Sequence, residues 1–148
     1  MLELYGRGGK LITVVCVGGN NAKAEDRPDN FVSTLEEYTE EMSAFFDALK
    51  KRSATVIAVG GGFYDESKTN PKDNPLTGGK SYLTNKRKQE FEHQQELMCG
   101  KKGIPFIRVN VSEDEWKREY LSNDGVHPND KGHTMIAGKV MAEIKHLL

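Results

Sequence analysis

The sequence of 148 residues predicts one α/β domain built around a parallel sheet. Three short apolar segments rich in β-branched residues alternate with stretches of helical periodicity, and this alternation is typical of parallel strands joined by helices. The chain is long enough for a single domain, residues 1–148, and too short for two. The crossovers between successive strands are expected to be right-handed.

Continuous apolar segments mark the three expected strands. The first, 11–17, is apolar on both faces, so helices are expected to cover it on both sides. The second is 55–59, which runs into Gly60-Gly61-Gly62, and the third is 105–111. Three strands make a thin sheet, and the first strand has at most one evident neighbour. Residues 1–10 are too few and too rich in glycine to supply a helix and another strand.

Apolar residues at helical spacing mark three helices. The first covers 35–49, where Ser33 or Thr34 can cap its start. A weaker helix is expected over 84–99, and the last over 130–146. The apolar stripe of the last helix consists of Met135, Ile136, Val140, Ile144 and Leu147.

The remaining segments are predicted to be polar surface or inert core. Residues 63–82 are rich in Asn, Pro, Asp and Gly and are predicted to form a surface loop over the strand ends. Asn74 to Ser81 nearly matches a phosphate-binding loop, but Asn74 replaces the first glycine and no strand precedes it. Lys86-Arg87-Lys88 is predicted to be a solvated helix face, and Cys16 a buried, inert thiol.

The composition excludes several classes of partner. Lys plus Arg is 21 and Asp plus Glu is 22, so no nucleic-acid surface built on bulk positive charge is expected. The longest apolar run, 11–17, is far shorter than the ~20 residues that span a membrane. Two cysteines do not make a disulfide framework, and a reduced, cytoplasmic protein is expected. No cofactor is expected.

Polar residues follow the first strand, where ligands of open α/β sheets gather. Gly18-Gly19-Asn20-Asn21 stands at its end, and the two glycines let the backbone turn so that the Asn20 amide can donate a hydrogen bond. The same four residues are equally good β-turn chemistry, so a simple turn is the alternative.

A second polar group precedes the last helix. In Asp124-Gly-Val-His127-Pro128, an Asp three residues before a His can orient the imidazole through Nδ1 and leave Nε2 available as a base. Asn129 can cap the helix that follows. A capped helix with a surface histidine is one alternative, and a metal site made of Asp124, His127 and His133 is another, although no spacing here is a strong zinc signature.

Together the two motifs resemble the SGNH (GDSL-type) serine ester hydrolases, whose fold is a flavodoxin-like three-layer α/β/α arrangement. The resemblance implies that His127 is the general base, Asp124 its orienting carboxylate and Asn20 an oxyanion donor on a turn shaped by Gly18 and Gly19. Asn21 departs from the aspartate usual in the first motif. The segment Asp65-Glu-Ser and the following Asn74-Pro75 and Ser81-Tyr82 also look like a loop of prokaryotic members.

The Gly-Asp-Ser motif that carries the nucleophile in this family is absent from the sequence. The resemblance therefore covers roughly the C-terminal two-thirds of such a hydrolase, with three of about five strands. It implies hydrolysis of small-molecule esters by acyl transfer, with a nucleophile from a segment outside this chain. The alternatives are an inactive SGNH-like binding domain and a flavodoxin-like nucleotide or signalling domain. The unpaired edge of strand 11–17 further predicts a homo-oligomer.

Overall fold

The computed structural model describes residues 11–147, so the expectation about residues 1–10 lies outside the described part of the chain. Its main sheet has three parallel strands in the order β1-β3-β6. They are β1 (Ile12–Val15), β3 (Thr55–Val59) and β6 (Phe106–Ile107), with Ile12 opposite Thr55 and Ala58 opposite Phe106. The predicted α/β class and parallel sheet are confirmed.

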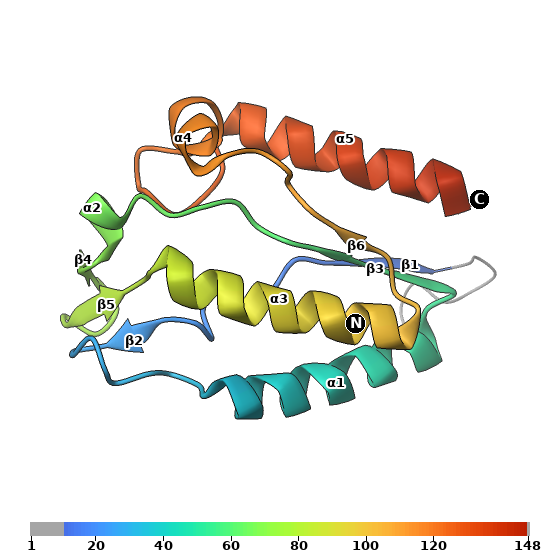
Figure 1. Ribbon diagram of the computed structural model, residues 1–148, viewed down its shortest axis with the longest axis horizontal. Coiled ribbons are helices and arrows are strands. Elements are labelled where there is room, and N and C mark those ends of the chain that lie inside the picture. The colour runs from blue at the N-terminus through green and yellow to red at the C-terminus, as the bar shows by residue number, and fades with distance from the viewer. Residues whose placement is uncertain (1–10, 148) are drawn as a thin grey trace.

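Three long helices flank this sheet. Helices α1 (Leu35–Arg52) and α3 (Asn85–Lys102) lie on one face, and α5 (Asp130–Leu147) lies on the other, which gives three layers (Figure 1). The predicted helices are therefore present; α1 and α3 each end three residues beyond the predicted range, and α5 ends one residue beyond it. α3 ends at Gly103, whose φ of 64° is a left-handed conformation that suits glycine.

The core lies between the sheet and the pair α1 and α3. Apolar side chains recur on one face of α1, and Thr34 caps its start in a capping box with Glu37. Val15 and Val56 of the sheet belong to the same buried cluster. From the helices, the cluster contains Tyr38, Met42, Phe46, Leu49, Phe91, Met98 and Cys99.

The segment predicted as a surface loop contains regular structure. It folds into α2 (Glu66–Thr69), β4 (Lys72–Asp73) and β5 (Lys80–Tyr82). β5 lies between β4 and β2 (Ala24–Glu25) in a second, antiparallel sheet. The residues that resemble a phosphate-binding loop form the turn of the β4–β5 hairpin, in which Gly78 N–H donates to Asn74 O.

The first and third strands are shorter than predicted. β1 ends at Val15, and helices do not cover both of its faces, because Val14 and Val17 remain 43% and 48% exposed. β6 has only two paired residues, and Asn110 beyond it has a φ of 55°, which is incompatible with a strand. On the α5 side of the sheet, the apolar stripe of α5 is half-buried and its last residue, Leu147, is exposed.

Two predictions about single side chains are wrong. Cys16 is exposed rather than buried, since β1 ends before it. The basic stretch 86–88 on α3 is not a fully solvated face. Arg87 stacks over the rings of Phe31 and Phe91, and the Lys88 side chain is only 14% exposed. Lys86 is the exposed residue of the three. In residues 11–147 no helix combines the length and apolar character required to cross a membrane.

Candidate functional site

Asp124 and His127 form a hydrogen-bonded pair at the start of the last helix. Nδ1 of His127 lies 2.6 Å from Oδ2 of Asp124 and donates to it, because a carboxylate can only accept. The His127 side chain is 72% exposed, so its other ring nitrogen is open to a partner in solution. This is the geometry of an imidazole oriented by a carboxylate.

Several donors hold the Asp124 carboxylate in place. Its Oδ1 accepts from the Ser122 hydroxyl at 2.6 Å, from the Val126 N–H at 2.8 Å and from the His127 N–H at 3.0 Å. Partial burial acts to raise the pKa of Asp124, but the hydrogen bonds from Ser122, His127 and Val126 outweigh it and hold that pKa well below the usual range. The carboxylate is therefore ionised wherever a neutral histidine base can work.

The loop that carries this pair is closed at its base. Leu121 and Pro128 form an antiparallel bridge, and Ser122 N–H donates to His127 O at 2.9 Å. Asn129 accepts from Gly132 N–H at 3.0 Å, as predicted for the N-cap of α5, and its amide donates to Glu119 O and Leu121 O. The entry of α5 and the end of the preceding π-helical turn η2 (Trp116–Tyr120) are thereby tied together.

The tip of the same loop rests on α2. Gly125 has a φ of 75°, and a Cβ there would lie 3.0 Å from Lys68 Cβ. Asp65 N–H donates to Gly125 O, and Lys72 Nζ donates to Asp124 O at 3.1 Å. The segment that starts with Asp65 thus supports the Asp124–His127 loop, a role that sequence reasoning did not assign to it.

Asn20 lies on the predicted turn after β1. Asn21 N–H donates to Gly18 O at 3.2 Å, which closes the turn, and Gly18 has a φ of 110°, a backbone region that favours glycine. The Asn21 amide donates to Ser33 Oγ at 3.3 Å and so ties the turn to the segment before α1. Asn20 itself is exposed at the rim.

One cavity brings the two motifs together. It has a volume of about 520 Å³, and both Asn20 and His127 line it. Its wall also includes Trp116, which is 1% exposed, and the exposed Cys16. Tyr120, whose ring packs against that of Trp116, does not line it.

No serine of residues 11–147 lines this cavity. Ser122 donates to the carboxylate of Asp124 and Ser67 donates to that of Asp65, at 2.6 Å in both cases, while Ser33 accepts from Asn21. The described residues therefore place Asn20 and the Asp124–His127 pair at one cavity that has no serine in its wall.

Sequence reasoning missed the groups that form the cavity wall after β3. Glu92 Oε2 accepts from Gly61 N–H at 3.0 Å, and Lys88 Nζ donates to Gly62 O. A Cβ at Gly60 would lie 2.5 Å from Glu92 Oε1, and one at Gly62 would lie 1.9 Å from the Trp116 ring. The run of three glycines was the available signal, since consecutive glycines mark a close approach of other groups to the backbone.

The structure separates the residues of the alternative metal site. His133 is exposed on α5 and does not line the cavity, whereas His127 does. Among residues 11–147, no three His, Cys, Asp or Glu side chains cluster in a way that would hold a metal ion.

Comparison with protein families finds one that covers most of the chain. Residues 7–135 match the GDSL-like lipase/acylhydrolase family. Comparison with curated proteins gives no match.

Solved structures share the fold at low sequence identity. A lipase/acylhydrolase from Enterococcus faecalis superposes with a TM-score of 0.67 at 17% identity, over 91% of this chain and 61% of that one. A GDSL-like lipase from Bacteroides thetaiotaomicron gives 0.65 at 17% identity, over 93% and 63%. A catalytic mutant of an acetylxylan esterase from Geobacillus stearothermophilus gives 0.61 at 17% identity, over 90% and 58%. The chain thus spans about three-fifths of the length of these structures.

Proposed function

Because this chain belongs to the GDSL-like lipase/acylhydrolase family, we propose that it supplies the acid–base half of an ester hydrolase. His127 is the general base, Asp124 orients it, and Asn20 donates to the oxyanion. The nucleophilic serine comes from polypeptide outside these 148 residues. The observation that carries the proposal is the 2.6 Å Asp124–His127 hydrogen bond beside a cavity that Asn20 also lines.

The reaction proceeds by acyl transfer. The serine oxygen attacks the ester carbonyl carbon while Nε2 of His127 takes the hydroxyl proton, and the Asn20 amide donates to the resulting oxyanion. The intermediate collapses by breaking the bond to the alcohol oxygen, which receives the proton from His127. Water then attacks the acyl-serine with His127 again as base, and the carboxylic acid leaves as the serine is regenerated.

An inactive binding domain is the second candidate, and one observation favours it. The cavity holds Asn20 and His127 but no serine of the described residues, so it is able to bind an ester or a carboxylate without cleaving it. The hydrolase requires a nucleophilic serine from outside this chain, whereas the binding domain does not. The presence of that serine is therefore what an experiment has to test.

The chain alone is expected to be nearly inactive toward p-nitrophenyl acetate. Loss of the nucleophile costs about 10⁶ in kcat in a serine protease, and one oxyanion donor recovers only about 10²–10³. Purified protein and its His127→Ala variant should therefore hydrolyse the ester at the same rate. A kcat near 1 s⁻¹ that His127→Ala abolishes would contradict this and would assign the reaction to a serine already present, such as Ser33, Ser67 or Ser122.

The complementary experiment supplies the missing group. The coding sequence upstream of Met1 is read for a Gly-Asp-Ser motif, and the polypeptide that carries it is co-expressed with this chain. Activity that returns with the serine and disappears when that serine becomes alanine supports the hydrolase. Tight binding of acetate or p-nitrophenyl acetate with no such motif upstream supports the binding domain.

We further propose that a second copy of the chain pairs with the open edge of β1. Within residues 11–147, β1 pairs with β3 alone, and Val14 and Val17 beside that edge are exposed. An unprotected strand edge presents unpaired N–H and C=O groups, each of which costs about 1–3 kcal/mol when buried without a partner. A two-fold axis at this edge would join the two sheets into one.

Sedimentation velocity at low micromolar concentration tests the pairing. We expect twice the mass of the chain, and a monomer for Val14→Lys, because a charge on an edge strand opposes strand addition. Val32→Lys is the matched control, since Val32 is also exposed but precedes α1. A monomeric wild-type chain whose amides at 11–17 are strongly protected from exchange would contradict the proposal.

A further inference from the structure

Two tyrosines press on the glycines that precede Asn20. The Tyr38 hydroxyl lies 2.4 Å from the position that a Cβ on Gly18 would take, and the Tyr64 hydroxyl lies 3.0 Å from the equivalent position on Gly19. Tyr38 comes from α1, whereas Tyr64 follows β3, so the turn is held from two sides. The Asn20 turn therefore packs directly against two rigid aromatic side chains.

Both tyrosines are buried and remain neutral. They are 1% and 5% exposed, and burial raises the pKa of each to about 12. The Tyr38 hydroxyl has no hydrogen-bond partner among residues 11–147. Its position is thus determined by packing of its ring, which lies 4.7 Å from that of Phe91 in the core.

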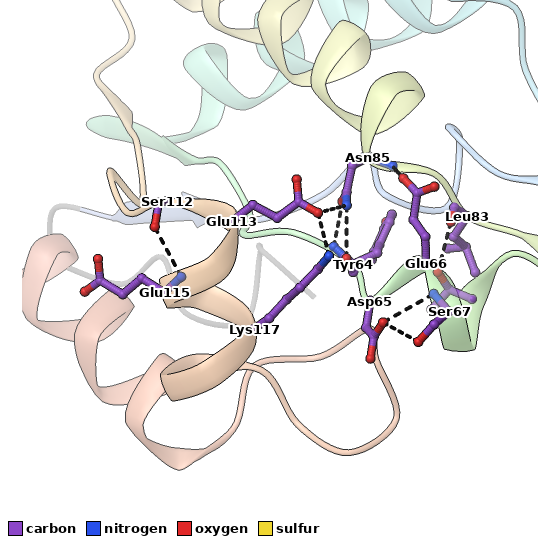
Figure 2. Close-up of polar contacts among 11 residues, drawn as sticks. Tyr64, Asp65, Glu66, Ser67, Leu83, Asn85, Ser112, Glu113, Glu115 and Lys117 are labelled. Carbon is purple, nitrogen blue, oxygen red and sulfur yellow. Dashed lines mark hydrogen bonds and ion pairs between the residues drawn. The ribbon is translucent and has the colours of Figure 1, made fainter.

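Tyr64 is instead held through its main chain, and Asn85 is the residue that holds it. Tyr64 N–H donates to Asn85 Oδ1 at 2.7 Å, and Asn85 Nδ2 donates to Tyr64 O at 3.0 Å (Figure 2). The Asn85 amide thereby pairs with Tyr64 much as a neighbouring strand would. Only an amide supplies both a donor and an acceptor in this orientation.

Asn85 is in turn fixed by two carboxylates. Its N–H donates to Glu66 Oε1 at 2.6 Å, and its Nδ2 also donates to Glu113 Oε1 at 3.2 Å (Figure 2). Glu113, in α4 (Glu113–Glu115), forms an ion pair with Lys117 at 2.6 Å. Asn85 is 7% exposed, so these bonds are largely sheltered from water.

We propose that Asn85 is a positioning residue for Asn20, acting through Tyr64 and Gly19. By fixing the main chain of Tyr64, Asn85 places its ring against Gly19 and so sets the direction of the Asn20 amide toward the cavity. The catalytic meaning of this arrangement rests on the proposed function, but the arrangement itself is tested without any hydrolysis.

The test follows the Asn20 side-chain NH₂ signal and the amides of residues 18–21 by NMR. In Asn85→Ala we expect these signals to shift and their heteronuclear NOEs to fall. Ser53→Ala is the matched control, because it removes the Thr13–Ser53 hydroxyl hydrogen bond of 2.7 Å at the other end of the parallel strands. If residues 18–21 keep their shifts and NOEs in Asn85→Ala, the proposal is wrong, even if the melting temperature falls.

A second pair of variants tests the contact if Asn85→Ala fails to fold. Gly19 has no left-handed φ, so Gly19→Ala meets only the Tyr64 hydroxyl at 3.0 Å. Gly19→Ala should therefore displace the Asn20 signal, and adding Tyr64→Phe should return it toward the wild-type position. A displacement that Tyr64→Phe leaves unchanged would overturn the contact.

Activity separates this proposal from the proposed function. In the complemented enzyme, Asn85→Ala should lower kcat about tenfold with KM unchanged, a part of the about 10²–10³ that one oxyanion donor contributes. If the complemented enzyme shows no hydrolysis but Asn85→Ala gives the expected NMR changes, the proposed function is wrong and the positioning role of Asn85 stands.

Discussion

Replacing His127 with alanine should lower kcat of the complemented enzyme about 10⁶-fold, or ~8 kcal/mol of transition-state stabilisation. The variant has no imidazole to accept the serine proton. The Asp124 carboxylate lies behind the ring, 2.6 Å from its Nδ1, and does not occupy the position of Nε2. Asp124→Ala should cost less, about 10⁴, because the carboxylate orients the base and does not itself take the proton.

Hydrolysis of p-nitrophenyl acetate, corrected for the uncatalysed rate, measures both effects. His133→Ala is the matched control, since His133 is exposed on α5 and does not line the cavity that holds Asn20 and His127. The assigned roles would be wrong if His127→Ala left kcat unchanged, or if Asp124→Ala lowered kcat more than His127→Ala does.

Gly62→Ala should strongly destabilise the fold. Its Cβ would lie 1.9 Å from the indole of Trp116, and that ring is almost fully buried and cannot move aside without shifting η2. Overpacking of this kind costs about 1–3 kcal/mol and occasionally more. Urea unfolding followed by circular dichroism measures the loss.

Gly138→Ala is the opposite control. No atom lies within 4 Å of a Cβ at Gly138, which is inside α5, so alanine should raise the free energy of unfolding by about 0.5–1 kcal/mol. Equal stability of Gly62→Ala and the wild type would show that Trp116 does not pack against this glycine as described.

The parts of the fold that were predicted correctly depend on local sequence. The strand 55–59 is apolar and buried from Val56 to Val59, and its ends coincide with the prediction. The contact between Asp124 and His127 spans three residues, and its geometry follows from the chain itself. The N-caps Thr34 and Asn129 likewise satisfy helix ends next to them in the sequence.

The parts that were missed depend on residues far apart in the chain. Lys88 is shielded because its Nζ donates to Gly62 O and lies over the ring of Tyr64, contacts that a local run of basic residues cannot reveal. The small antiparallel sheet joins β2 to β5, more than fifty residues later, through two residues from each strand. Val14 is exposed because no helix in residues 11–147 covers its side chain, and the apolar pattern of β1 does not reveal whether a helix will lie there.

The loop that carries Asp124 and His127 combines local and long-range contacts. Every side-chain hydrogen bond that orients the two side chains comes from residues 122–127, so these contacts are local in the sequence. The position of this stretch in the fold depends on distant residues, because Asp65 N–H donates to Gly125 O and Lys72 Nζ donates to Asp124 O. The mutual orientation of Asp124 and His127 is thus encoded locally, whereas their position beside Asn20 depends on the whole fold.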